Sequence, residues 1–246
     1  MTLPRYLAIA GRIGSGKDTL AGRLSRAFGF RPVAMADELK RRTRDMLHVS
    51  EDALWGPSES RGRPLDPTTL AVGLDYWRMS SYWGDLFPTG TSYAVRERLA
   101  WDTMQRIMQG PKPGTVPTVR WALQLLGTEF GRELDRDVWV RAWRRAADHL
   151  LDGRGYDPQR GCMLTPSEAP PGVVVTDLRF PNEAQSGLDA GGRVLLLDAE
   201  ARIGPRVDNH ASEDDTALRL FSTRVDANGS ADDTFRNACV ALGLSS

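Results

Sequence analysis

The stretch YLAIAGRIGSGKDT, residues 6–19, decides the fold of this chain. Its first five residues are apolar, and this short run predicts a buried strand over residues 5–10. The strand leads directly into a glycine-rich loop, after which Leu20, Leu24 and Phe28 recur at helical spacing. A strand, a glycine loop and a helix in immediate succession predict the first unit of a parallel α/β fold.

The glycine loop has the spacing of a phosphate cradle, G-x-x-x-x-G-K. Glycines let successive backbone N–H groups turn toward one anion, and the helix that follows adds the positive end of its dipole. Lys17 supplies a point charge that can reach the β- and γ-phosphates of a nucleotide. A glycine turn that only reverses the chain would need no lysine there. The predicted phosphate-binding residues are Gly11, Gly14, Ser15, Gly16, Lys17, Asp18 and Thr19.

Asp18 occupies the position where such loops usually carry a hydroxyl. A serine or threonine there would ligate Mg²⁺ directly, whereas an aspartate can hold the ion through water. Thr19, the next residue, offers a hydroxyl to a phosphate. An aspartate followed by a threonine at these positions favours a kinase over a GTPase switch protein.

Further strands are predicted at residues 31–37, 173–177 and 193–198, and a last strand followed by a turn is predicted at 222–230. Continuous β-branched or leucine runs are typical of strands buried on both faces, so we expect a parallel sheet covered by helices on both sides. Between about 38 and 151 the patterns are mostly helical and predict an insertion beside the sheet, and residues 152–172 predict a loop. We expect Asp37 to be the N-cap of its first helix. Residues 50–93 predict irregular connections around a short element near 68–82.

The composition is that of an ordinary globular enzyme: 246 residues, 41% hydrophobic, with no formal net charge. Zero net charge gives no global attraction to nucleic acid or to an anionic membrane. The two cysteines, Cys162 and Cys239, lie far apart and lack the spacing of metal ligands. No apolar run approaches the roughly 18 residues of a membrane-spanning helix. We therefore expect a cytoplasmic protein with no membrane contact and no stable nucleic-acid complex.

Charged residues after two of the predicted strands are catalytic candidates beside Lys17. In open parallel sheets ligands bind at the carboxyl edge, where Asp177 can organise Mg²⁺ or orient an attacking oxygen and Arg179 can grip a phosphate. Alternatively, these two residues pair with each other and Asp177 caps the next helix. Arg202 and Arg206 predict a loop that closes over a nucleotide and excludes water, or they are simply solvated.

Residues 1–50 contain ten lysines and arginines against four acidic residues. This excess places positive potential around the glycine loop. The densest part, KRRTR at 40–44, is either part of that potential or a solvated helix face.

These motifs together resemble the deoxynucleoside monophosphate kinases of tailed bacteriophages, within the P-loop nucleoside monophosphate kinase group. The resemblance spans the chain in one order, and its later motifs are more specific than the glycine loop alone. It rests on GRIGSGKDT (11–19), MADELK (35–40), LQLLGTEFGRE with DVWVRAW (123–143), VVVTDLRFPNEA (173–184) and HASE (210–213).

The resemblance implies an α/β fold with a P-loop kinase-like parallel sheet, in a single domain over 1–246. The core would be about 1–37 and 172–246, the acceptor-binding helical insertion about 38–171, and a lid loop about 199–215. It implies in-line transfer of a phosphoryl group from ATP, with Mg²⁺ held by Asp18 through water or by Asp177, to a deoxynucleoside 5′-monophosphate. The residues implied to bind the acceptor are Asp37, Lys40, Gln124, Thr128, Glu129, Arg132, Trp139, Asp177 and Arg179, and those implied near adenine are Asn228 and Gly229.

Several alternatives stay open. Trp139 and Trp121 either form an apolar wall for a base or belong to the core. Residues 55–118 depart from the family's shared blocks, and the aromatic residues in them form either a substrate cover or the surface of a homodimer. A kinase for another acceptor, such as a modified base in phage DNA, would have a basic aromatic groove. A nucleotide-binding switch or assembly protein would bind ATP without acceptor-dependent turnover.

Overall fold

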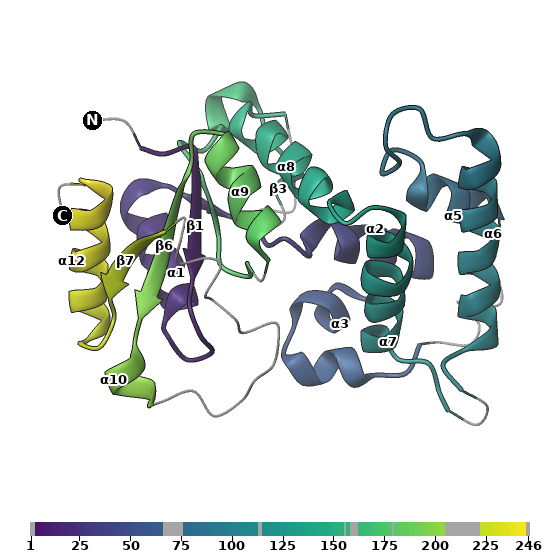
Figure 1. Cartoon of the computed structure of the whole chain (residues 1–246), viewed down its shortest axis with the longest axis horizontal. Coiled ribbons are helices and arrows are strands. Elements are labelled where there is room, and N and C mark those ends of the chain that lie inside the picture. The colour runs from purple at the N-terminus through teal and green to yellow at the C-terminus, as the bar shows by residue number, and fades with distance from the viewer. Residues whose placement is uncertain are drawn as a thin grey trace. The chain divides into compact units, whose positions relative to one another are not determined.

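The computed structural model describes residues 3–65, 76–112, 115–154, 156–157, 162–178, 180–204 and 222–244. The chain forms two compact units. We call residues 1–35 with 143–246 the sheet unit and residues 36–142 the helical unit. Figure 1 shows the elements of both units.

The sheet unit is built on a parallel sheet in which the described strands follow the order β2-β5-β1-β6-β7. The central strand β1 is buried along its whole length. The connection from β1 to β2 runs toward one edge of the sheet, whereas the connection from β5 to β6 runs toward the other edge. In open α/β sheets the crevice that binds ligands lies where the connections diverge in this way. The strands are β1 Tyr6–Ala10, β2 Arg31–Pro32, β5 Val173–Val175, β6 Arg193–Asp198 and β7 Thr223–Asp226.

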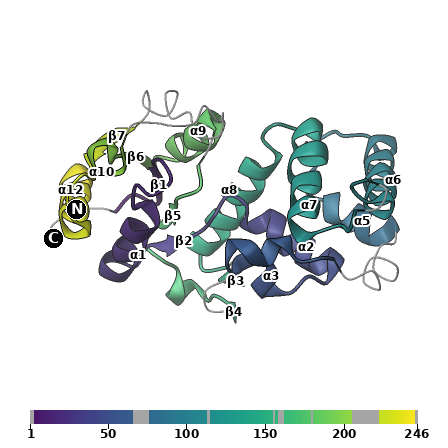
Figure 2. The ribbon, with the colours of Figure 1, turned by 90° about the horizontal axis from the view of Figure 1, so that it is seen from below.

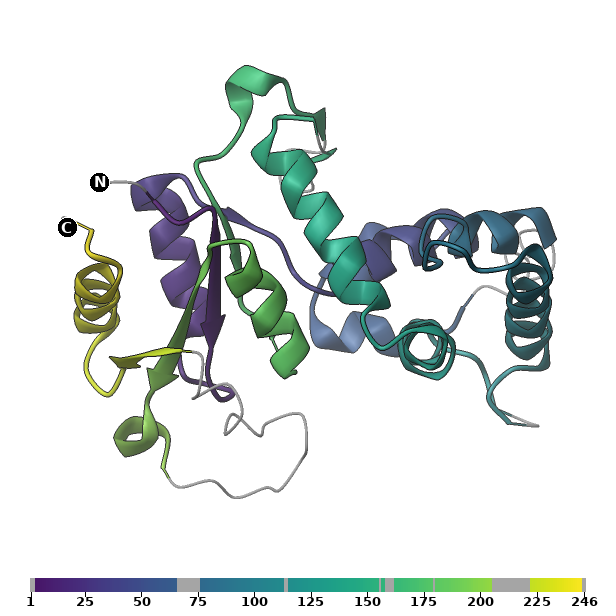
Figure 3. The same cartoon turned by 45° about the horizontal axis from the view of Figure 1, so that its top comes forward.

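Helices cover both faces of the sheet, as the sequence predicts. Successive residues of β1 point to opposite faces. Leu7 and Ile9 belong to the core that includes α1 (Lys17–Phe28) and α12 (Ala231–Leu242). Tyr6 and Ala8 belong to the other core, with α9 (Pro181–Asp189) and the sheet-unit part of α8 (Val138–Leu151). Figure 3 shows the sheet edge-on between these two layers. The α/β fold class is therefore confirmed.

The helical unit has a hydrophobic core of its own, in which Leu54, Met79, Trp83 and Leu125 are fully buried. Helices α5 and α6 lie side by side in Figures 1 and 2 and pack against each other. Its elements are α2 Asp37–Leu47, α3 Glu51–Trp55, the 3₁₀ turn η1 Ser58–Gly62, α5 Tyr76–Trp83, α6 Tyr93–Gln109, α7 Val119–Gln124 and the π-helix η2 Leu125–Arg132.

Short elements complete the sheet unit. The strands β3 (Tyr156–Asp157) and β4 (Cys162–Met163) pair antiparallel, and the 3₁₀ turn η3 (Pro166–Glu168) follows them. The four-residue helix α10 (Glu200–Ile203) follows β6 directly.

Two local predictions are wrong. The strand expected at 31–37 spans only Arg31–Pro32, because at Met35 the backbone N–H donates to Asp177 Oδ1 (2.8 Å) instead of to a strand. Asp37 is not the N-cap of α2: the N-cap is Ala36, whose side chain makes no capping bond. The Asp37 carboxylate instead accepts from Nε1 of Trp55 at 2.9 Å, which a local capping rule does not foresee.

The irregular segment expected at 50–93 contains helices. Ser50 caps α3 by accepting from the N–H of Ala53, and Ser92 caps α6 by accepting from the N–H of Val95. The short element expected near 68–82 overlaps α5, and residues 66–75 lie outside the described residues.

Candidate functional site

The loop between β1 and α1 lies at the crevice created by the strand order and has the conformation of an anion cradle. Gly16 is the N-cap of α1 with φ 89°, a left-handed conformation that glycine adopts without strain. No side chain caps this helix, so its first N–H groups stay open toward a ligand. Open N–H groups and the positive end of a helix dipole together bind phosphate. The predicted strand, glycine loop and helix are therefore confirmed as structure.

Two side chains of the loop favour the same ligand. Lys17 is the first residue of α1 and half-buried, and no carboxylate in the described part of the chain pairs with it. Ser15 is 1% exposed, and its Oγ has no hydrogen-bond partner among the described residues. A buried hydroxyl without a protein partner is typical of a site that a ligand or water completes. The residues present therefore fit a phosphate group.

Two aspartates lie where the helix α1 begins and the strand β5 ends. The hydroxyl of Thr176 donates to Asp18 Oδ1 at 2.6 Å, which joins the start of α1 to the residue after β5. The next residue, Asp177, accepts from the N–H of Met35, so it holds the chain that leaves β2. Asp18 and Thr19 are exposed. The carboxyl edge of the sheet thus carries carboxylates beside the cradle.

These carboxylates fit a Mg²⁺ ion that is held mainly by nucleotide phosphates and water. Within the described ranges, no three histidine, cysteine, aspartate or glutamate side chains cluster as a cage made only of protein ligands would require. Asp18 and Asp177 are the residues that would hold the ion. Bound there, the ion would neutralise negative charge on the phosphates.

The residues predicted for the lid and for adenine lie partly within the described structure. Arg202 is in α10, and its guanidinium donates to backbone carbonyls of the glycine loop. Asn228 Oδ1 accepts from the N–H groups of Ala201 and Arg202. Gly229 lies between this asparagine and α12. Arg206 and Arg179 lie outside the described residues.

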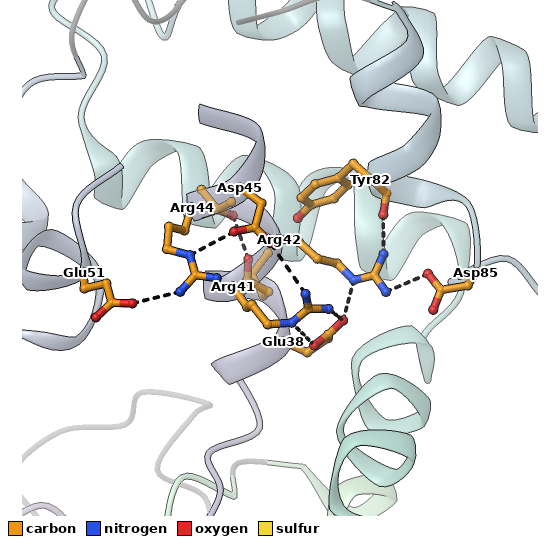
Figure 4. A network of polar contacts seen from close by, with 10 residues as sticks. Glu38, Arg41, Arg42, Arg44, Asp45, Glu51, Tyr82 and Asp85 are labelled. Atoms are coloured by element: carbon orange, nitrogen blue, oxygen red, sulfur yellow. Dashed lines mark hydrogen bonds and ion pairs between the residues drawn. The ribbon is translucent and has the colours of Figure 1, made fainter. Parts of the chain in front are cut away.

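In the helical unit, the basic run 40–44 is largely ion-paired, as Figure 4 shows. Glu38 accepts from Arg41 and from Arg42 at 2.6 Å each, and hydrogen bonding to Glu38 raises the pKa of Arg41. Arg42, only 11% exposed, also donates to the carbonyl of Tyr82. The remaining ion pairs in the figure are Arg41 with Asp45, Arg42 with Asp85, and Arg44 with Asp45 and Glu51. The three arginines therefore carry a packed network rather than an open basic surface.

Lys40 differs from these arginines. Within the described residues it has no carboxylate partner, and its Nζ lies 5.9 Å from the ring centroid of Trp55. The same indole donates to Asp37, so three side chains of α2 and α3 lie together. An ammonium over an indole is held in place but keeps its hydrogen-bond donors for an anion.

Four other residues predicted to contact an acceptor lie at the end of α7 and along the π-helix η2. Gln124, Thr128 and Glu129 are exposed and Arg132 is half-buried. The opposite face packs tightly, because a Cβ on Gly127 would lie 2.7 Å from Leu39 and one on Gly131 would lie 2.6 Å from Trp139. π-helices occur often at functional sites.

Trp139 belongs to the core rather than to an open wall. It is 7% exposed, its ring centroid lies 6.4 Å from that of Trp83, and its Nε1 donates to the carbonyl of Gly127 at 2.8 Å. This packing fits the core interpretation of the indole, and its contact with an acceptor stays a prediction. Trp121 is half-buried, and the guanidinium carbon of Arg106 lies 5.8 Å from the centroid of its ring.

Sequence reasoning missed several contributors. Thr176, Arg12 and the supporting role of Asn228 depend on partners far away along the chain, and no local pattern reveals them. The spacing of Gly127 and Gly131 was a usable signal, since two glycines four residues apart on a helix predict a close approach on one face. Of the four tryptophans in residues 55–118, Trp83 is buried, Trp55 is half-buried, and Trp77 and Trp101 are exposed.

No family model matches the sequence, and no curated protein matches it. Among solved structures there is a weak likeness to a gluconokinase from Sinorhizobium meliloti 1021. The match covers 99% of this chain and 94% of that chain, with a TM-score of 0.37 and 15% sequence identity. Among the described residues, no helix is both long and apolar enough to cross a membrane.

Proposed function

We propose that this protein is an ATP-dependent kinase that phosphorylates deoxynucleoside 5′-monophosphates. The observation that carries the proposal is the cradle after β1, with an uncapped helix N-terminus, Lys17 without a carboxylate partner in the described chain, and the buried hydroxyl of Ser15. Such a cradle suits the phosphates of a nucleoside triphosphate. Lys17 stabilises charge on these phosphates, and Asp18 and Asp177 would hold Mg²⁺.

Lys40 supports an acceptor that carries a phosphate. The chain has three lysines, Lys17, Lys40 and Lys112. In a basic run whose arginines are ion-paired, Lys40 keeps an ammonium that no carboxylate of the described chain engages. Trp55 lies against this ammonium and fixes Asp37. The class of acceptor, a deoxynucleoside monophosphate, rests on the resemblance of the motifs to the phage kinases.

The reaction needs no covalent intermediate. The enzyme has to hold the donor phosphate and the acceptor oxygen in line, neutralise charge and exclude water. In this proposal the glycine loop orients the ATP phosphates and Lys40 with the exposed face of η2 orients the acceptor.

The test is ADP formation by the purified protein with ATP and Mg²⁺, with dAMP, dGMP, dCMP, dTMP and the four ribonucleotides offered separately. We expect ADP only with one or a few deoxynucleotides, and Lys17→Met should reduce the rate at least a hundredfold, on the order of what one lost electrostatic donor costs. Lys112→Met is the matched control, because this exposed lysine lies outside both predicted sites. An acceptor-independent rate, or no ADP at all, would contradict the proposal.

Transfer to a base in DNA is the other kinase considered, and the ion-paired run 40–44 weighs against the basic groove that it needs. ADP formed with duplex DNA but with none of the mononucleotides would favour that function instead.

A further inference from the structure

Two arginines join the glycine loop to the short helix α10. One lies in α10 and donates to the loop, and the other lies in the loop and donates to the residue after α10. Arg202, in α10, donates from Nη2 to the carbonyls of Gly14 (3.2 Å) and Ser15 (2.9 Å). Arg12, in the loop, donates from Nη1 to the carbonyl of Gly204 at 2.9 Å. Figure 1 shows α10 below the loop that follows β1.

These contacts bear on how the loop binds an anion. When backbone N–H groups turn toward a phosphate, the carbonyls of the same peptide units turn away and need donors of their own. A guanidinium forms charge-assisted hydrogen bonds to such carbonyls and stays protonated at all physiological pH values. One nitrogen of Arg202 serves two consecutive peptide units of the loop. The N–H of the first unit, that of Ser15, donates to the carbonyl of Arg12 at 3.0 Å, so the N–H that Arg202 orients for a ligand is that of Gly16, in the second unit.

Arg202 is itself held from behind. Its Nε donates to the carbonyl of Ala227 at 3.1 Å. Asn228 Oδ1 accepts from the N–H of Ala201 (2.8 Å) and of Arg202 (3.3 Å), which satisfies open donors of α10. Asp226 in turn accepts from the backbone N–H (3.0 Å) and the Nδ2 (2.8 Å) of Asn228. The turn after β7 thus supports α10, and α10 supports the glycine loop.

We propose that Arg202 and Asn228 are positioning residues that hold the glycine loop ready for ATP before ATP binds. Arg202 acts through the carbonyls of Gly14 and Ser15 and does not contact the transferred phosphoryl group. Asn228 acts through Arg202 and not through the adenine edge. This inference rests on the proposed binding of ATP at the loop and departs from the roles expected of both residues as lid and adenine contacts.

The experiment compares Arg202→Met, Arg202→Lys and Asn228→Ala with the wild-type protein. Arg193→Met is the matched control, because Arg193 also donates to backbone carbonyls, those of Ala241 and Leu242, but at the amino end of β6. Three quantities are measured: ATP affinity without acceptor, hydrogen exchange of the 11–19 amides in the ATP-free protein, and kcat at saturating ATP.

For Arg202→Met we expect ATP affinity to fall roughly tenfold to a hundredfold, because two carbonyls lose their donor. The 11–19 amides should exchange faster without ATP, and kcat at saturating ATP should stay within about threefold, as for lost uniform binding. Arg202→Lys should resemble Arg202→Met, since an ammonium lacks the planar fork that reaches three carbonyls. Asn228→Ala should shift the same quantities less, and Arg193→Met should shift neither ATP affinity nor exchange in the loop.

A lid arginine would behave differently. Unchanged exchange in the ATP-free loop, with ATP affinity retained and kcat lowered by two or more orders of magnitude, would overturn the inference. Equal loss of ATP affinity in Arg193→Met would also overturn it. Should Arg202→Met fail to fold, Asn228→Ala decides, because it leaves Arg202 in place. Failure of the proposed function is a separate result, namely wild-type protein without acceptor-dependent ADP formation, while exchange in the ATP-free loop still tests the positioning role.

Discussion

Thr176 donates a hydrogen bond of 2.6 Å from its hydroxyl to the carboxylate of Asp18. Asp18 occupies the position where glycine loops of this kind usually carry a serine or threonine. A hydroxyl still lies beside this position, but it belongs to Thr176, the residue after β5. Asp18 is thereby oriented by a partner from a neighbouring strand. The loop thus departs from the common pattern but keeps an oriented carboxylate beside the cradle.

Replacing Asp18 should lower the apparent affinity for Mg²⁺ more than replacing Thr176 does. We expect Asp18→Asn to raise the Mg²⁺ concentration for half-maximal ADP formation roughly tenfold, and Thr176→Val to raise it less, because the carboxylate then remains. Mg²⁺ titrations at fixed ATP measure both. Asp232→Asn is the control, since this aspartate also lies in the first turn of a helix, α12, but pairs with Arg23. Equal titration curves for Asp18→Asn and Asp232→Asn would remove Asp18 from the metal site.

Lys40 should act on the acceptor alone. Lys40→Met removes the ammonium over Trp55, and we expect the KM for the deoxynucleotide to rise about tenfold or more while the KM for ATP stays within about twofold. Steady-state kinetics with each substrate varied in turn measure the two constants. A rise in both constants, or in neither, would contradict the assignment, and Lys112→Met again provides the baseline.

The tight side of the π-helix should tolerate no added methyl group. A Cβ at Gly131 would lie 2.6 Å from Nε1 of Trp139 and 2.8 Å from the carbonyl of Leu126, so Gly131→Ala should destabilise the protein by about 1–3 kcal/mol. Gly187, inside α9, has no atom within 4 Å of such a Cβ, and Gly187→Ala should stabilise by up to about 1 kcal/mol. Urea unfolding of both variants reports the two opposite shifts. A stabilised Gly131→Ala protein would show that the indole moves aside.

The N-terminus of α12 should give the stability a dependence on acid pH. Hydrogen bonds from Ser230 lower the pKa of Asp233 below its ordinary value of 3.8. A carboxyl group with a lowered folded-state pKa stabilises above its unfolded-state pKa, and this stabilisation is lost as the pH falls through the folded-state pKa. Asp233→Asn should therefore lower the urea midpoint at pH 7, and the difference from wild type should shrink below about pH 4. An equal difference at pH 7 and pH 3 would contradict the linkage.

The parts of the fold that could be predicted are those whose signals are local. The strand predicted at 5–10, the helix from Lys17 and the strand predicted at 193–198 follow from apolar runs and spacing, and the structure has them at nearly the same residues. Asp37 shows why capping was harder: its carboxylate is engaged by Trp55, eighteen residues away, and only the packing of α2 on α3 brings them together.

The same difference between local and long-range contacts decides which parts of the candidate site could be predicted. The glycine loop could be predicted because all its components are consecutive in the sequence. Trp139 was open to two interpretations, because helical spacing gives the same pattern for a core indole and for a binding wall. Arg202 could be identified as a candidate from its place after a strand, but its carbonyl partners in the loop depend on how β1 and β6 pair.

The scarcity of lysine turns the proposed substrate positions into separately readable chemical probes. A reagent that acylates amines finds three side chains in this sequence, and each has a different place in the proposal. A bound nucleoside triphosphate would shield Lys17 from acylation, a bound phosphorylated acceptor would shield Lys40, and neither ligand would shield Lys112. Mass spectrometry of the three lysine-containing peptides would then report the occupancy of both substrate sites in one sample, with the acylation of Lys112 as the internal reference.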